Sequence, residues 1–377
     1  MASRPARNSS PSGTAESAVS AWRAVLAFSL LAMPGSAWAA QDIPPPPKGM
    51  FAPPGRGITH VAGDVYRANN GGWHVAFVVT DDGIVLVDTL NTGFAQWLKA
   101  ELAQRFPGKP VKYVIYSHSH WDHAEGGAVF RDTATFIAHE RMLRNMDGRY
   151  PMLPGDIVDR NADGFLDVGE FEQPFLDRLW YCGAFRSAVT DKDRDRDGRA
   201  TPAEFFADTV KPDLVYAERM TLRTGGKTLQ LVHPGRNHAD DGTAVLFTDE
   251  RVLFGSDFPA DALVQDTMRS LPSACGPFDG HPLQEWIDSY RRLEALDFDL
   301  LVGGHGSRAF GRQDLVEGRG YLEYLVREVE GAMQRGMSLA DMKRRLLLEP
   351  YRDWRHYAAL REHNIEAAYL NLRRLRP

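Results

Sequence analysis

The sequence His118-Ser119-His120-Trp121-Asp122-His123 places three imidazoles and one carboxylate within a single short stretch. It follows residues 111–116, an apolar run typical of a buried strand. Neutral imidazole and carboxylate are natural ligands of zinc and similar ions, and this spacing lets alternate side chains face two adjacent metals. A purely structural role explains such a cluster poorly. The stretch therefore predicts a metal site.

The residues before this stretch alternate between strand and helix patterns. Residues 75–80 and 84–88 are predicted strands, joined by the turn Asp81-Asp82-Gly83. Apolar residues at helical spacing predict a helix at residues 92–106, which Pro107-Gly108 ends. A strand, a helix and a second strand in this order predict an α/β fold, in which chemistry lies past the carboxyl ends of strands.

The pattern changes after residue 150 and later resumes. Residues 151–213 alternate acidic loops with short helical stretches, which indicates an insert within one domain. Strand patterns return at residues 228–232, 243–248, 252–254 and 300–302. We therefore expect one catalytic domain in two parts, 58–150 and 214–313, around this insert. Residues 314–377 are predicted to form a helical C-terminal region.

Several motifs together carry a resemblance to a known family. Residues 118–123 and the following Gly126-Gly127 resemble the signature of the metallo-β-lactamase superfamily. Later motifs match in order: Pro234-Gly235-Arg236-Asn237-His238, then Gly255-Ser256-Asp257, then Gly303-Gly304-His305-Gly306. The similarity covers roughly residues 58–306, less the insert. It implies an αββα sandwich, here with an inserted helical pair and a helical tail.

The resemblance also implies a dinuclear site. Two zinc ions are expected, with iron or manganese as alternatives. The first would be held by His118, His120 and His238, and the second by Asp122, His123 and His305, with Asp257 bridging. An Asp at the bridging position resembles the glyoxalase II and lactonase branches and the relatives near quinoprotein oxidation systems. His233 is an alternative to His238. His139 could line the pocket or lie at the surface, and Asp88 is expected either to orient a ligand or to form a turn.

Such a site predicts hydrolysis. Two bridged ions would lower the pKa of their water to about 7, so that a metal-bridged hydroxide is the nucleophile and Asp122 orients it. The expected substrate is an ester, lactone, thioester or amide, a β-lactam among them. Two other readings stay open: a di-iron redox enzyme of the same fold, and a non-catalytic calcium-binding protein.

The insert contains two acidic loops with the spacing of the twelve-residue EF-hand loop. Oxygen ligands fall at the expected positions, with a backbone carbonyl at position seven, and a glycine supplies the sharp turn. We expect two structural calcium ions in a paired module. The expected ligands are Asp159, Asn161, Asp163, Phe165, Asp167 and Glu170 in the first loop, and Asp193, Asp195, Asp197, Arg199, Thr201 and Glu204 in the second.

The start of the chain resembles an export signal. Three arginines precede the apolar residues 24–33, and Ala37-Trp38-Ala39 offers small residues for cleavage. We expect a signal peptide at 1–39, a Pro-rich linker at 40–57 and a periplasmic or secreted protein. The alternative, an uncleaved anchor, is disfavoured because the apolar stretch is short and Pro34 follows it.

Composition narrows the partners. The chain has 377 residues, 43% of them hydrophobic, which is enough for a full core. A net charge of -6 without a basic stripe argues against nucleic acid. The expected partners are a small-molecule substrate and calcium, with no membrane span after signal cleavage. Cys182 and Cys275 form either one disulfide or two separate thiols.

Overall fold

The computed structural model describes residues 55–146, 163, 165, 191–258, 271–272, 278, 281–305 and 310–374. All of them belong to the compact unit Ala40–Pro377. Several predictions lie outside the described residues: the signal peptide, the linker up to residue 54, both cysteines, and the first acidic loop apart from Asp163 and Phe165.

Seven strands form the first sheet, in the order β1 to β7. Neighbouring strands from β1 to β4 pair antiparallel, and those from β4 to β7 pair parallel. The parallel half brings the carboxyl ends of β4, β5 and β6 to one edge of the sheet. The bounds are β1 Arg56–Ala62, β2 Val65–Asn70, β3 Trp73–Thr80, β4 Gly83–Val87, β5 Val111–Ile115, β6 Thr135–His139 and β7 Leu214–Tyr216.

Five strands form the second sheet, in the order β12-β11-β10-β9-β8. All neighbours pair antiparallel except β11 and β12, which are parallel. The ends of these two strands therefore also lie side by side. The bounds are β8 Arg219–Thr224, β9 Lys227–Val232, β10 Ala244–Phe247, β11 Val252–Ser256 and β12 Leu300–Gly303.

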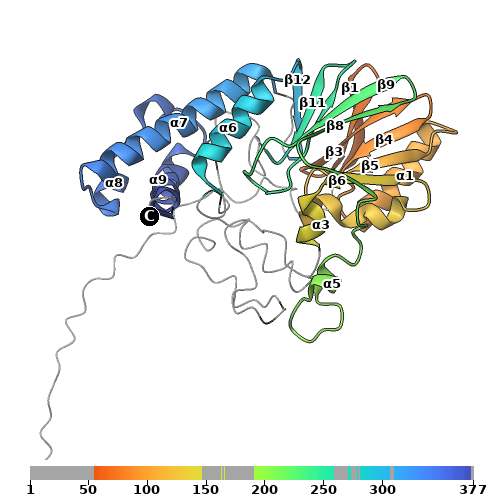
Figure 1. Ribbon diagram of the computed structural model, residues 1–377, viewed down its shortest axis with the longest axis horizontal. Helices are drawn as coiled ribbons and strands as arrows, with labels where there is room; N and C mark the ends of the chain where they lie inside the picture. Colours follow the sequence, from red (N-terminus) through yellow and green to blue (C-terminus); the bar gives the residue numbers. More distant parts are fainter. Residues whose placement is uncertain are drawn as a thin grey trace, which may run out of the picture. The chain divides into compact units, whose positions relative to one another are not determined.

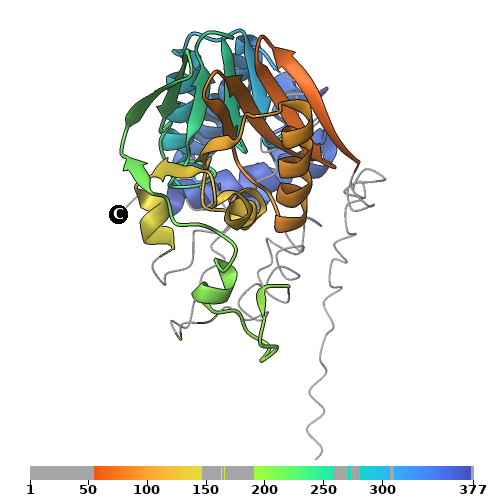
Figure 2. The same ribbon diagram turned by 90° about the vertical axis from the view of Figure 1, so that its right-hand side faces the viewer.

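Alternating side chains divide the core into two parts. Val78 and Val85 of the first sheet share one buried cluster with Leu231 and Phe254 of the second, so this cluster fills the space between the sheets. Phe77, from the same strand as Val78, belongs to a second cluster that contains apolar residues of the helices. Helices cover the outer face of each sheet (Figures 1 and 2). The result is a helix, sheet, sheet, helix sandwich, which confirms the predicted α/β fold.

The helices that cover the two sheets come from separate parts of the sequence. α1 begins at Asn91, whose side chain accepts a hydrogen bond from Phe94 N at 2.9 Å. On the other side α6 packs against α7, and α7 against α9, which confirms the helical C-terminal region. The bounds are α1 Thr92–Arg105, α2 Trp121–Ala124, η1 Glu125–Phe130, α3 Arg141–Asn145, α5 Pro202–Phe205, α6 Leu283–Glu294, α7 Arg312–Gln334, α8 Leu339–Arg345, η5 Glu349–Tyr351 and α9 Tyr357–Arg374.

Some elements were not predicted from the sequence. β1 and β2 are partly exposed, and β7 has only three residues, so none has a strong apolar run. α6 does carry a helical pattern, with Leu283, Trp286, Ile287, Tyr290 and Leu293 buried. No helix among the described residues is long and apolar enough to span a bilayer.

Candidate metal centre

The predicted metal ligands all lie just beyond strand ends. His118 and His120 follow β5, and Asp122 and His123 lie in α2. His238 comes from the loop between β9 and β10, whereas Asp257 directly follows β11 and His305 lies two residues after the end of β12. Four separate chain segments therefore meet at one place, as expected for a site at the carboxyl ends of strands.

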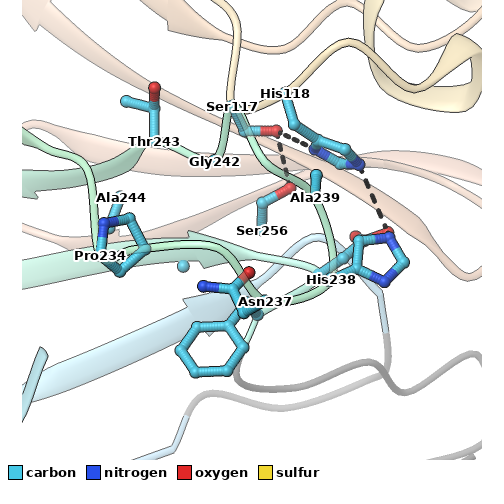
Figure 3. Close-up of a pocket in the computed structure, with 13 residues that line it drawn as sticks. Ser117, His118, Pro234, Asn237, His238, Ala239, Gly242, Thr243, Ala244 and Ser256 are labelled. Carbon is cyan, nitrogen blue, oxygen red and sulfur yellow. Dashed lines mark hydrogen bonds and ion pairs between the residues drawn. The ribbon is translucent and has the colours of Figure 1, made fainter. Parts of the chain in front are cut away.

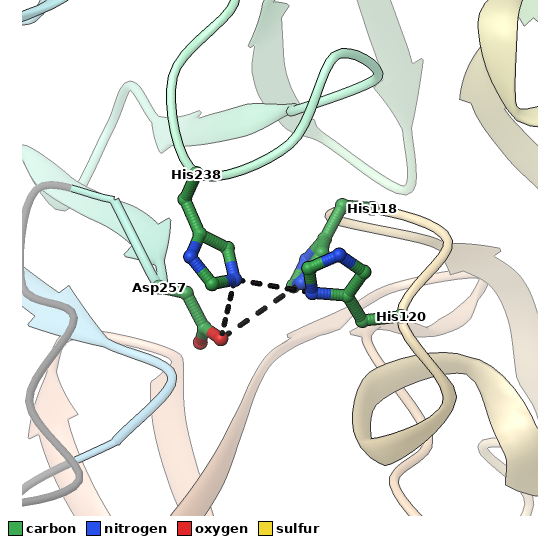
Figure 4. Close-up of side chains that lie close together, drawn as sticks. All are labelled: His118, His120, His238 and Asp257. Atoms are coloured by element: carbon green, nitrogen blue, oxygen red, sulfur yellow. Dashed lines mark hydrogen bonds and ion pairs between the residues drawn. The ribbon is translucent and has the colours of Figure 1, made fainter. Parts of the chain in front are cut away.

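One group of donor atoms comprises His118, His120, His238 and Asp257 (Figure 4), and these atoms lie within 4.8 Å of one another. His238 Nε2 is 3.1 Å from His120 Nδ1. Asp257 Oδ2 is 3.4 Å from His238 Nε2 and 3.8 Å from His118 Nε2. Three imidazole nitrogens and one carboxylate oxygen thus converge on a single point.

A second group comprises Asp122, His123, His305 and again Asp257. Asp257 Oδ1 is 3.0 Å from both His123 Nε2 and His305 Nε2. Asp122 Oδ2 lies 3.6 Å and 3.7 Å from the same two nitrogens. The Asp257 carboxylate therefore belongs to both groups, with one oxygen directed at each.

The pKa values of His118 and Asp257 are both shifted well below their usual ranges. Burial and the neighbouring imidazoles of His120 and His123 hold the pKa of His118 well below its usual value. Burial would raise the pKa of Asp257, but His123 and His305 hold it well below its usual range. Asp257 is thus an anion surrounded by imidazoles, most of which are fully buried.

The donor set fits divalent cations. His123 Nε2 faces His305 Nε2 at 3.3 Å, and two facing imidazole nitrogens can be satisfied only by a shared proton or by a cation. His118 Nε2 is buried and makes no hydrogen bond with the described residues. Buried polar atoms without partners are rare in folded proteins. Imidazole nitrogen and carboxylate oxygen are ligands that suit zinc, iron and manganese.

A layer of hydrogen bonds supports these side chains. Asp88 Oδ2 accepts a hydrogen bond from His123 Nδ1 at 2.9 Å, which leaves Nε2 of that ring for a ligand role. Asp88 Oδ1 accepts a hydrogen bond from Ser117 N at 2.7 Å. Ser117 Oγ in turn contacts His118 Nδ1 at 2.9 Å and Ser256 Oγ at 2.7 Å. The sheets are therefore joined by polar contacts directly beneath the site.

A small pocket of about 10 Å³ adjoins the first group, with His118, Asn237, His238, Ser256 and Asp257 among its lining residues (Figure 3). Such a volume has room for about one water molecule. Gly304 lies close to Asp257 and His123. A Cβ atom at this residue would lie 2.7 Å from Asp257 Oδ1 and 2.8 Å from His123 Cε1, so only glycine fits without displacement.

Trp73 contacts two members of the second group. Trp73 Nε1 donates a hydrogen bond to Asp122 Oδ2 at 3.2 Å, and its ring lies edge-on to His305 with centroids 5.7 Å apart. The Asp122 carboxylate is therefore fixed by a residue of β3 and not only by its own helix α2. Trp121, between His120 and Asp122 in the sequence, is half-buried.

The family model described as the metallo-beta-lactamase superfamily matches residues 73–305. This chain belongs to the metallo-β-lactamase superfamily. The matched region begins at Trp73 and ends at His305, so it includes both groups of donor atoms. It also spans the insert.

Two relatives with named activities resemble this superfamily member. The 2,4-dinitroanisole O-demethylase subunit alpha of Nocardioides sp. (strain JS1661) is 26% identical over 278 residues, 72% of this chain and 64% of the relative. The linear primary-alkylsulfatase of Pseudomonas sp. (strain ATCC 19151) is 23% identical over 279 residues, 72% of this chain and 49% of the relative. The chain thus spans less than two thirds of the length of either relative.

A solved structure shares the fold. The stereoselective inverting sec-alkylsulfatase Pisa1 from Pseudomonas sp. is 19% identical, with a TM-score of 0.53. The match covers 83% of this chain and 50% of the sulfatase.

The structure brings all seven residues predicted as ligands of the superfamily site into the two groups. His233 lies in neither group: its ring stacks on His139 with centroids 4.1 Å apart, and its Nδ1 contacts Gly242 O at 2.8 Å. The sequence assigned no role to Trp73 or Ser117, and it presented Gly304 only as part of the motif that contains His305. The only available signal was that Ser117 and Gly304 adjoin ligands, since the partner of each lies far away in the sequence.

The second acidic loop is described in full. Asp193, Asp195 and Asp197 form a third group of closely spaced carboxylates, all of them on a partly or fully exposed loop. Glu204 Oε1 accepts a hydrogen bond from Arg194 N at 3.0 Å, and Thr201 begins α5 as its N-cap. A hydrogen bond from the Asp197 amide lowers the pKa of Asp195, but desolvation and the neighbouring carboxylates raise it above its usual value.

The described residues of the two loops touch each other. Arg199 Nη1 lies 3.3 Å from Asp163 Oδ2, and its guanidinium lies over the Phe165 ring, 5.1 Å from the ring centroid. Asp163 Oδ1 also accepts a hydrogen bond from Phe165 N at 3.0 Å. The position-seven residues of the two loops, Phe165 and Arg199, are therefore neighbours.

Proposed function

We propose that this protein is a dinuclear metal-dependent hydrolase, with zinc as the expected metal. The observation that carries the proposal is the position of Asp257, whose two carboxylate oxygens are directed at separate groups of imidazoles. Under this proposal His118, His120 and His238 hold one ion, Asp122, His123 and His305 hold the other, and Asp257 bridges them. Bound there, two divalent ions would supply Lewis acidity and activate water at neutral pH.

The chain's own residues would then orient the metal-binding side chains and accept a proton from water. Asp122 is the more accessible carboxylate, with 18% of its side chain exposed against 6% for Asp257. Its Oδ2 is fixed by Trp73, which leaves Oδ1 to accept a proton from the attacking water. His123 is held in one tautomer by Asp88. This rigid arrangement favours attack on a bond presented from the Asp122 side.

The proposed substrates are small molecules with a bond that water can cleave. Membership of the superfamily is compatible with carboxylic esters, lactones, thioesters and amides, including β-lactams. The named relatives are an alkylsulfatase and an aryl methyl ether demethylase, whose names indicate cleavage of a sulfate ester and of an aryl ether. We therefore place sulfate esters and activated aryl ethers first among the substrates to be tested.

The proposal is tested by hydrolysis assays on one panel of substrates. The panel contains a primary alkyl sulfate, a nitroaryl methyl ether, a lactone, a thioester and a chromogenic cephalosporin. Turnover of any of these, lost by at least a hundredfold in His120→Ala and Asp122→Ala, supports the proposal. Equal turnover in both variants and in the unmodified chain would overturn it.

The proposal extends to the insert and to location. We assign two calcium ions to a paired EF-hand module, because the position-seven residues Phe165 and Arg199 are in contact and carboxylates crowd the second loop. We further propose that residues 1–39 are an export signal and that the mature protein is periplasmic or secreted. Cleavage after Ala39, read by mass spectrometry of exported protein, tests this part.

A further inference from the structure

Lys192 lies between the second acidic loop and the metal-binding turn. Its side chain is 6% exposed, and its Nζ is 2.8 Å from Glu125 Oε2. The same Nζ lies 5.8 Å from the ring of Trp121 and 5.9 Å from the ring of Phe205. The Lys192 ammonium group therefore contacts Glu125 and Trp121, near the metal-binding turn, and also Phe205, which follows the second acidic loop.

The residues that Lys192 contacts adjoin metal ligands. Trp121 is the neighbour of both His120 and Asp122, and Glu125 lies two residues after His123. α2, which carries Asp122 and His123, has four residues, and its N-cap residue His120 makes no side-chain capping hydrogen bond. So short a helix makes little intrinsic contribution to its own stability. Its orientation must come from tertiary contacts.

Two hydrogen bonds also join residues 208–210, which follow the second acidic loop, to residues near the metal-binding turn. Ala128 N, in η1, donates a hydrogen bond to Asp208 O at 3.2 Å. Val210 N donates to Tyr116 Oη at 3.3 Å, next to the start of the metal motif. Within residues 191–210, which the structure describes, Lys192 contacts α2 itself through the Trp121 ring. A buried ion pair loses much of its attraction to desolvation, so general stability alone explains its presence poorly.

We propose that Lys192 is a positioning residue of the metal group formed by Asp122, His123 and His305. It acts through Glu125 and the Trp121 ring, and it fixes the direction in which α2 presents the Asp122 carboxylate and the His123 ring. The inference rests on the proposed function, because it assumes that this group holds an ion.

The test is a cobalt titration of the chain stripped of metals, followed by visible absorption and calorimetry. Asp122→Asn and His120→Asn serve as references that identify which binding step belongs to which group. Lys192→Met and Glu125→Gln should each weaken the step that Asp122→Asn weakens, by about 10- to 100-fold, and leave the other step unchanged. The double variant should weaken it no more than either single variant, because the two residues act as one unit.

Two further variants separate positioning from stability. Lys192→Arg keeps the charge and should recover most of the lost affinity. Lys211→Met, the same substitution at an exposed lysine of the same segment, should bind both ions as the unmodified chain does. Circular dichroism of each variant checks that it is folded, and thermal unfolding without metal records its stability.

The possible failures are distinguishable. An unmodified chain that binds fewer than two cobalt ions would overturn the proposed function, whatever the variants do. A Lys192→Met chain that is folded, with lower thermal stability but both ions bound as in the unmodified chain, would overturn the positioning role alone. If Lys192→Met does not fold, Glu125→Gln and Lys192→Arg decide the matter by the same step of the titration.

Discussion

Asp88 and His123 form a fully buried hydrogen bond at the base of the metal centre, with Asp88 Oδ2 2.9 Å from His123 Nδ1. Asp88 has a positive φ of 68°, a conformation that asparagine and aspartate adopt more readily than most residues. The chain thus tolerates local strain at the end of β4, where this carboxylate reaches across to α2. Partners of this kind orient a ligand and raise its basicity.

Replacement of Asp88 by Asn should weaken metal binding while the fold persists. Asn keeps the shape and the backbone conformation, but it removes the charge that orients His123. We expect about 10- to 100-fold lower affinity for the ion held by the His123 group, measured by titration against a competing chelator. The control is Asp249→Asn, at an exposed turn residue, which should leave the affinity unchanged. Unchanged affinity in Asp88→Asn would exclude this role.

Trp73→Phe tests the hydrogen bond that holds Asp122. The phenyl ring keeps the contact with His305 but cannot donate to the carboxylate, and a hydrogen bond to a charged group contributes about 1.5–3 kcal/mol. We expect kcat to fall about tenfold or more, with both metals retained. Trp97→Phe, in α1, is the matched control. A kcat equal to that of the unmodified chain would show that Asp122 needs no such support.

The stability of the chain should fall in mild acid because of His139. Burial, together with the neighbouring His233, lowers the pKa of His139 to about 4. Its Nδ1 already accepts a hydrogen bond from Arg141 N at 3.3 Å, so protonation there has no acceptor. The folded chain keeps this ring neutral, whereas the unfolded chain protonates it near pH 6.5. Its contribution is therefore fully present above pH 6.5 and is lost as the pH falls towards 4.

The free energy of unfolding, measured by urea titration between pH 7 and pH 4, checks this expectation. The slope due to His139 is at most about 1.4 kcal/mol per pH unit. His139→Gln should be less stable at pH 7 but should lose less stability on acidification. His60→Gln, at an exposed position of β1, should keep the slope of the unmodified chain. Identical slopes for His139→Gln and the unmodified chain would contradict the assignment.

Calcium should stabilise the zinc-loaded chain. The carboxylates of Asp193, Asp195 and Asp197 repel one another, and a bound cation would neutralise them. At a calcium concentration one hundred times Kd, a single site adds about 2.7 kcal/mol to the free energy of unfolding. Asp195→Asn should reduce the calcium-dependent rise in Tm, and magnesium at the same concentration is the ionic control. A Tm that is independent of calcium would rule out the paired calcium module.

The sequence predicted one series of strands and helices and the clustered donor residues, but it did not predict β7. The β3, β4, α1, β5 series was predictable because its apolar residues follow strong strand and helix periods. The two groups of donor residues were predictable because four of their members stand together between His118 and His123, and the others lie within three residues of a glycine, in a recognisable order. β7 was not, because a three-residue strand whose Leu214 and Val215 are exposed gives no periodic signal.

Contacts between distant segments could not be predicted. Trp73 and Asp122 are 49 residues apart, and their hydrogen bond exists only because the start of β3 lies beside α2. Lys192 and Glu125 are likewise far apart in sequence, and each is an unremarkable charged residue there. Local patterns identify ligand types, whereas the residues that orient them are defined by the tertiary fold.

The most direct test of the central claim is the metal content of the zinc-loaded, dialysed chain, measured by mass spectrometry beside Asp257→Ala. Two ions per chain are expected for the unmodified protein. Asp257→Ala should weaken both, because one oxygen of this carboxylate is directed at each group. A chain that retains fewer than two ions, or an Asp257→Ala variant that retains both as tightly, would contradict a centre bridged by Asp257.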